Sequence, residues 1–133
     1  MSSTRKRISI LCPVYNEEET IQIFYDRLQK ALASVLDRYD FEIVFLNNRS
    51  TDRSLSILRE LRARDPAIQV LTMSRNFGYQ PSVQAGMSYA TGDGIVVIDA
   101  DCEDPPELIP EFLAKWEEGY DVVFGIRKDR AEH

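Results

Sequence analysis

The amino-acid sequence predicts an α/β fold in which a mainly parallel sheet is flanked by helices. Short apolar runs alternate with longer stretches whose apolar residues recur at helical spacing. The run from Ile95 to Ile98 has no polar interruption, which is typical of a strand buried on both faces, and acidic residues follow it at once. Strands that alternate with helices are joined by crossovers, so the sheet is expected to be parallel.

Local signals set the ends of the expected elements. Asn16 is expected to cap the first helix, because acidic residues at 17–19 suit the positive end of a helix dipole. Pro81 suits a first helical turn, and Gly119 a helix end. The predicted strands are residues 8–12, 41–46, 68–71, 94–98 and 121–126, and the helices between them are 17–36, 51–64, 81–90 and 106–118.

The order of the strands decides which loops meet. In the common doubly wound, Rossmann-like order 3-2-1-4, the first and fourth strands are neighbours, and ligands bind at their carboxyl ends. The loop at 13–17 should then face Asp99-Ala100-Asp101, with the loop at 47–52 beside them. The sequence therefore predicts one polar crevice built from several loops.

Composition limits the class of protein. A chain of 133 residues is expected to form one domain, here 1–133. The net charge of −6 argues against nucleic acid as a partner, since a phosphate groove needs a basic stripe. Two cysteines, Cys12 and Cys102, make no disulfide framework, so a reduced, cytoplasmic setting is the default, with core packing and a redox pair as alternative roles. No signal peptide or membrane span is evident, so this length of chain is expected to be soluble.

Carboxylates gather directly after the fourth predicted strand. Acids crowded at a closing rim repel one another unless a cation lies among them, and Mg²⁺ and Mn²⁺ prefer oxygen ligands. Asp99 and Asp101 are therefore candidate metal-site and catalytic residues, and the alternative is an ordinary solvated acidic turn. A dinucleotide glycine fingerprint and a Walker loop are both missing, and His133 is the only histidine, so dehydrogenase and Ser-His-Asp chemistry are not expected.

Several linked motifs resemble family 2 glycosyltransferases, and above all the polyprenyl-phosphate branch, which includes bactoprenol glucosyltransferases and dolichol-phosphate mannose synthases. The resemblance covers about residues 8 to 130 in the expected order. The motifs are Pro13-Val14-Tyr15-Asn16-Glu17-Glu18, residues 42–47 with Ser50-Thr51-Asp52, Ser74-Arg75-Asn76-Phe77-Gly78, Asp99-Ala100-Asp101 with Asp104-Pro105-Pro106-Glu107, and residues 118–123.

The resemblance implies the nucleotide-diphospho-sugar transferase fold and an enzyme that inverts the anomeric centre. The donor would be a UDP- or GDP-sugar held with Mg²⁺ or Mn²⁺, and the acceptor a polyprenyl phosphate. Family members are longer, so we expect the N-terminal donor-binding part of a protein that acts in cell-envelope synthesis. That protein would work at the cytoplasmic side of the membrane, which it would contact through a C-terminal part. Homo-oligomerisation, and turnover by this length of chain alone, stay open.

The resemblance also implies a role for individual residues. Asp101 and Glu103 would be metal ligands, with Asp99 on ribose or metal. The residues that would border the base, ribose or phosphates are Pro13, Tyr15, Glu17, Asn48, Arg75 and Arg127.

Three positions depart from the family pattern. Asn48 stands where Asp is usual, Arg49 where Gly is usual, and Glu103 where Gln is frequent. An amide oxygen still accepts a hydrogen bond from a base but lacks the charge that strengthens it, and a side chain at position 49 makes a positive φ less comfortable. The alternative function is therefore a non-catalytic nucleotide-binding or assembly module with a degenerate donor site. A third and weaker hypothesis is a magnesium phosphatase that uses Asp99 as its nucleophile. It is weaker because such enzymes usually carry the acid pair after their first strand.

Overall fold

A computed structural model describes residues 5–76 and 78–119. Its four strands are β1 (Lys6–Val14), β2 (Tyr39–Asn47), β3 (Ile68–Thr72) and β4 (Gly94–Val97). Its helices are α1 (Ile21–Ala33), α2 (Ser54–Arg64), α3 (Tyr79–Tyr89) and α4 (Ile109–Glu117), and the short 3-10 helix η1 (Pro106–Leu108) leads into α4. The fifth predicted strand, 121–126, lies outside the described residues.

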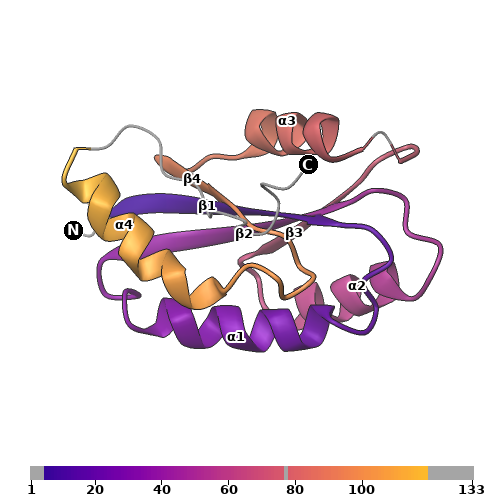
Figure 1. The fold of residues 1–133 in the computed structure, drawn as a ribbon, viewed down its shortest axis with the longest axis horizontal. Coiled ribbons are helices and arrows are strands. Elements are labelled where there is room, and N and C mark those ends of the chain that lie inside the picture. The colour runs from indigo at the N-terminus through magenta and orange to yellow at the C-terminus, as the bar shows by residue number, and fades with distance from the viewer. Residues whose placement is uncertain (1–4, 77, 120–133) are drawn as a thin grey trace.

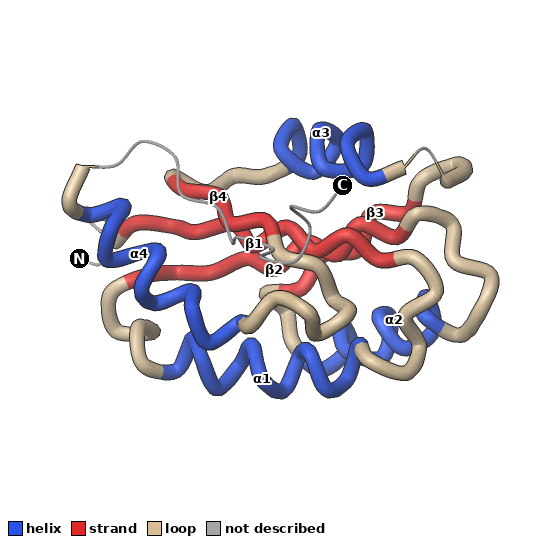
Figure 2. The backbone as a smooth tube through the Cα atoms, viewed as in Figure 1, coloured by secondary structure: helices blue, strands red, loops and turns tan. Residues whose placement is uncertain are grey.

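The sheet has the predicted order. All three strand pairings are parallel, and the order is β3-β2-β1-β4. The strands β1 and β4 therefore lie side by side, at the point where the winding of the chain reverses. Helices α1, α2 and α4 cover one face and α3 the other (Figure 1). The tube view shows the strand ends giving way to loops at the same edge of the sheet (Figure 2). The expectation of a parallel α/β sheet flanked by helices is confirmed.

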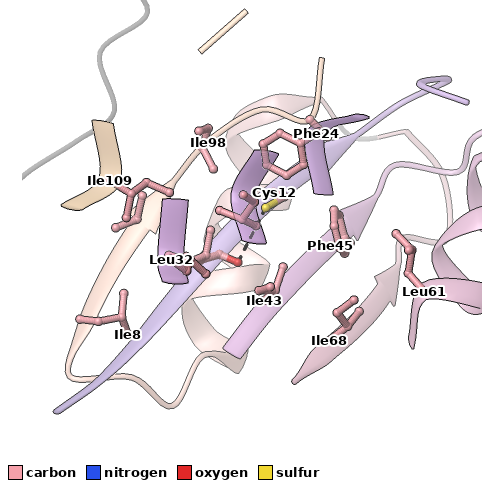
Figure 3. Close-up of a cluster of buried hydrophobic side chains, with 14 of the residues drawn as sticks. Ile8, Cys12, Phe24, Leu32, Ile43, Phe45, Leu61, Ile68, Ile98 and Ile109 are labelled. Atoms are coloured by element: carbon pink, nitrogen blue, oxygen red, sulfur yellow. Dashed lines mark hydrogen bonds between the residues drawn. The ribbon is translucent and has the colours of Figure 1, made fainter. Parts of the chain in front are cut away.

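The main core lies between the sheet and the three helices on one face. Side chains alternate along the strands, so Ile8, Ile10 and Cys12 point into this core while Leu11 packs toward α3. Phe24 of α1 meets Phe45 of β2 edge to face, with ring centroids 6.4 Å apart. The core side chains labelled in Figure 3 are Ile8, Cys12, Phe24, Leu32, Ile43, Phe45, Leu61, Ile68, Ile98 and Ile109.

The strand β1 runs two residues further than expected. Pro13, the first residue after the predicted strand 8–12, pairs in register with Leu46, and the strand ends at Val14. The carbonyl of Leu11 accepts the N–H of Ile98 (2.9 Å), so the backbone hydrogen-bonding groups of odd-numbered residues in β1 point toward β4. The pairing between β1 and β4 ends at Leu11. The backbone nitrogen of Pro13 points to the same side, beyond the last residue that pairs with β4. The N–H that proline lacks would therefore have made no hydrogen bond within the sheet.

The helix α1 begins later than expected. It starts at Ile21 with Thr20 at the N-cap position, whereas the sequence predicted a start at 17 with Asn16 as the cap. Asn16 has a φ of 53° and its side chain accepts hydrogen bonds from another loop, so it cannot cap α1. Leu36, the last residue of the predicted helix 17–36, lies past the end of α1 and is 53% exposed.

Candidate active site

The carboxyl ends of the four strands form one polar rim. The β1–α1 loop carries Tyr15 and Glu17, and the β2–α2 loop carries Asn48. The segment after β4 carries Asp99 and Asp101. Because every strand runs in the same direction, these loops all leave the sheet at one edge.

Hydrogen bonds tie the β1–α1 loop to the β2–α2 loop in both directions. The backbone N–H groups of Asn16, Glu17 and Glu18 donate to Ser50 Oγ (3.0 Å), Ser54 Oγ (2.8 Å) and Asp52 Oδ2 (3.2 Å). In return, Asn16 Oδ1 accepts the N–H of Thr51 (2.8 Å), and Glu18 Oε1 accepts the N–H of Arg53 (2.8 Å). We call this set of contacts between residues 16–18 and 50–54 the loop brace.

Two further contacts join the remaining loops to the β1–α1 and β2–α2 loops. The Thr20 hydroxyl donates to the carbonyl of Ala100 (2.8 Å), between the two candidate acids Asp99 and Asp101. Arg49 Nη1 donates to the carbonyl of Ser74 (3.2 Å), which connects the β2–α2 loop to the loop that carries Arg75. Loops that follow all four strands are therefore linked at the rim.

Carboxylates at the rim influence one another. Burial raises the pKa of Glu17, and the negative charges of Asp101 and Asp99 raise it further. Burial also raises the pKa of Cys12 well above its usual value, with the charge of Asp99 adding to the effect. Three carboxylates from the β1 and β4 loops thus share one electrostatic field, which favours a bound cation.

The rim acids alone do not make a complete metal site. Within the described residues, no three His, Cys, Asp or Glu side chains come close enough to enclose an ion by themselves. Mg²⁺ and Mn²⁺ are commonly held by one or two carboxylates, with waters and substrate phosphates completing the shell. Asp101 is half-buried and its Oδ1 accepts the N–H of Glu103 (3.0 Å), so both acids that the resemblance proposed as ligands lie in one tight turn.

The base-side residues differ in exposure. Asn48 is only 5% exposed, and its Oδ1 has no hydrogen-bond partner among the described residues. Tyr15 is 44% exposed, which leaves its ring accessible at the rim, while Pro13 is buried within β1. Arg75 lies exposed in the loop after β3, and Arg127 lies outside the described residues.

Sequence reasoning placed Glu17, Asn48, Asp99 and Asp101 in one crevice, and the fold brings their loops together. It gave no role to Thr20 or Ser54, and it gave Asn16 the wrong one. Ser50 and Asp52 belong to a motif that carried the resemblance, but their partners lie 34 residues earlier in the chain, so nothing local reveals their contacts. Both cysteines are free, and the buried Cys12 thiol, with its raised pKa, is poorly suited to redox chemistry.

A parallel α/β sheet with acid-rich loops at its carboxyl edge is the architecture of a ligand-binding α/β domain. The chain belongs to the family described as glycosyl transferase family 2, whose model matches residues 9–132.

Relatives of known sequence agree with this assignment. An uncharacterised glycosyltransferase, YkcC, of Bacillus subtilis is 50% identical over 122 residues, which are 92% of this chain and 37% of the relative. A prophage bactoprenol glucosyl transferase homologue of Escherichia coli is 44% identical over 125 residues, 94% of this chain and 40% of the relative. The chain thus spans about two fifths of the length of the curated relatives that it matches.

Solved structures share the fold. The mannosyltransferase PcManGT from Pyrobaculum calidifontis, in complex with GDP-Man and Mn²⁺, matches with a TM-score of 0.72 at 24% identity over 91% of this chain and 34% of that one. TarS of S. aureus (residues 1–349), in complex with UDP-GlcNAc, matches with a TM-score of 0.66 at 24% identity over 84% of this chain and 31% of that one. The fold implied by the sequence resemblance, that of the nucleotide-sugar transferases, is therefore confirmed.

The described residues contain no helix with the length and apolarity needed to cross a bilayer.

Proposed function

We propose that this chain is the donor-binding part of a metal-dependent, inverting glycosyltransferase. It would take a UDP- or GDP-sugar as donor and pass the sugar to an acceptor, a polyprenyl phosphate. The observation that carries the proposal is the linked rim: the N–H of buried Asn48 donates to the Val14 carbonyl, and Thr20 of the β1–α1 loop donates to the Ala100 carbonyl between Asp99 and Asp101. Two relatives named for bactoprenol glucosyl transfer support the acceptor.

Each part of the rim has a task in this proposal. Tyr15 offers an accessible aromatic face for a base, and Asn48 offers a buried acceptor to a ring N–H. Asp101 and Glu103 would hold Mg²⁺ or Mn²⁺ and Asp99 the ribose or the ion, while Glu17 borders the ribose. Arg75 and Arg127 would meet phosphates. The metal, when bound, supplies positive charge to the departing diphosphate.

The proposed chemistry needs little acid–base help from the protein. In sugar transfer, a phosphate oxygen of the acceptor attacks the anomeric carbon while the bond to the nucleoside diphosphate breaks on the opposite face. The phosphate is already ionised near neutral pH, so no histidine is needed to remove a proton. What the chain contributes is orientation of the donor and exclusion of water around its diphosphate.

Calorimetric titration tests the donor site. UDP, GDP and UDP-glucose are titrated into the 133-residue chain with and without MnCl₂. We expect binding that depends on Mn²⁺ and that falls at least about tenfold in Asp101→Asn, because a metal ligand is lost. Asp37→Asn, an exposed acid beyond the far end of α1, is the matched control and should bind as the unaltered chain does.

The result also separates the two candidate functions. Nucleotide binding that ignores Mn²⁺ and Asp101 would favour the non-catalytic module, which Asn48 and Arg49 suggest. Absence of binding to any nucleotide would reject the donor site altogether. The acceptor is tested with the full-length protein, by transfer of radiolabelled sugar to polyprenyl phosphate in detergent.

A further inference from the structure

Asn16 directs both its backbone and its side chain toward the β2–α2 loop. Its N–H donates to Ser50 Oγ (3.0 Å), while its single carboxamide oxygen accepts the N–H groups of Thr51 (2.8 Å) and Asp52 (3.3 Å). The Thr51 hydroxyl approaches the same oxygen at 3.4 Å. One side chain therefore satisfies donors from two successive residues of the other loop.

The backbone of Asn16 makes this arrangement possible. Its φ of 53° is left-handed, a region that most residues with a side chain avoid and that Asn tolerates better than others. A residue held there at an exposed loop needs a compensating set of contacts. The three groups that converge on Asn16 Oδ1 supply that compensation.

The loop that Asn16 holds carries a side chain prepared for a ligand. Asn48 is 95% buried, given its 5% exposure, and its Oδ1 has no hydrogen-bond partner among the described residues. A buried acceptor without a hydrogen-bond partner costs free energy, and a ligand that supplies a donor removes this cost. Without the ligand, the surrounding structure must hold the side chain in place. The backbone of Asn48 is fixed by its N–H to the Val14 carbonyl (2.9 Å), and the residues that follow are fixed by Asn16.

We propose that Asn16 is a positioning residue of the candidate site: by holding Thr51 and Asp52, it keeps the carboxamide of Asn48 in the orientation that binds a nucleotide. This inference rests on the proposed function. Asn16 is not assigned any contact with the nucleotide, so it acts only through the β2–α2 loop.

Substitutions at position 16 separate the acceptor from the backbone conformation. Asn16→Gly keeps the left-handed conformation available and removes the acceptor, whereas Asn16→Asp keeps an acceptor oxygen at the same place. Ser56→Ala deletes a side-chain hydrogen bond on the exposed side of α2, to the Arg53 carbonyl (2.9 Å), and serves as the matched control.

The test is UDP binding by calorimetry with MnCl₂ present, with GDP as a second probe, supported by amide hydrogen exchange at Thr51 and Asp52. We expect Asn16→Gly to weaken binding about tenfold, since two or three hydrogen bonds are lost, and to speed exchange of both amides. Asn16→Asp should stay within about threefold of the unaltered chain, and Ser56→Ala should match it. Thermal unfolding shows that each variant is folded.

The outcomes are distinct. If the unaltered chain binds UDP or GDP and Asn16→Gly binds equally well, or Asn16→Asp is as weak as Asn16→Gly, the positioning role is wrong and the donor site stands. If the unaltered chain binds neither nucleotide, the proposed function fails and the positioning role fails with it.

Discussion

Residues with a side chain and a positive φ lie at the rim of the candidate site. In the part of the chain that the structure describes they are Asn16 (53°), Arg49 (63°) and Cys102 (69°), and each follows a different strand, β1, β2 or β4. Strained backbone is often found where a protein must hold a ligand-binding geometry. The expectation that position 49 suits glycine better than arginine is thus given a structural basis.

Replacing Arg49 by glycine should stabilise the protein slightly. The left-handed conformation costs a residue with a Cβ about 1–2 kcal/mol, and glycine removes this cost while losing the contact to Ser74 and adding entropy to the unfolded chain. We expect the free energy of unfolding to rise by about 0.5 kcal/mol in urea titrations. Arg49→Ala keeps the strain and loses the same contact, so it should be less stable than Arg49→Gly, and equal stability of the two variants would argue against strain at this position.

The sequence located most candidate residues but not what holds them. Asp99 and Asp101 could be found because an apolar run ends in acids, whereas the role of Asn48 came only from the family resemblance. Asn16 could not be interpreted correctly, because an Asn before a helical stripe resembles a cap, and the loop that it contacts lies 35 residues later. Arg127, which the resemblance proposed for a phosphate, stays a prediction because it lies outside the described residues.

At the scale of elements, the join between α3 and β4 is held by a buried polar cluster. Glu42 of β2 is 4% exposed and accepts the Ser9 hydroxyl (2.5 Å) and the N–H of Thr91 (2.7 Å). The N–H of Gly92 in turn donates to Ser9 Oγ (2.8 Å). This cluster lies in the amino-terminal halves of β1 and β2 and just before β4, away from the candidate site at the carboxyl ends.

The cluster leaves no room for a side chain at Gly92. A Cβ there would lie 2.5 Å from Ser9 Oγ, 2.7 Å from the Ser9 nitrogen and 2.9 Å from the Arg7 carbonyl. Two of these atoms are backbone, so the α3–β4 connection would have to move away from β1. We expect Gly92→Ala to lower the free energy of unfolding by about 1–3 kcal/mol, measured by urea denaturation.

Gln84→Ala, on the exposed surface of α3, is the matched control and should change stability by less than about 0.5 kcal/mol. A Gly92→Ala variant as stable as this control would mean that the connection is looser than the hydrogen bonds indicate.

At the scale of the whole molecule, stability should fall in acid. Burial alone would raise the pKa of Glu42, but the hydrogen bonds from Ser9 and Thr91 and the charge of Arg7 outweigh it and hold the pKa below its usual value. A carboxyl with a lowered pKa stabilises the fold above its unfolded pKa of about 4.3, and this contribution is lost as the pH falls through the folded value. Hydrogen bonds from Arg27 chiefly lower the pKa of Glu107 as well. This carboxylate therefore also stabilises the fold less as the pH falls.

Glu42→Gln isolates the contribution of this buried carboxylate. The variant keeps the shape but not the charge, so at pH 7 it should be less stable by about 1–2 kcal/mol. The charged carboxyl loses its advantage as the pH falls below the unfolded pKa of about 4.3, so the difference should be smaller at pH 3 than at pH 7. Urea denaturation at both pH values measures this, and a difference that does not depend on pH would show that the charge of Glu42 plays no part.

The parallel order of the strands has a consequence for how the chain is made. The central strand β1 receives one neighbour from residues 39–47 and the other only from residues 94–97, where Ile8 pairs with Gly94. During synthesis, one edge of β1 therefore stays without its partner until residues 94–97 have left the ribosome. Such long-range pairing slows folding, and an unpaired apolar edge invites association with other chains. Nascent chains stopped before β4 should thus depend on chaperones far more than those stopped just after it.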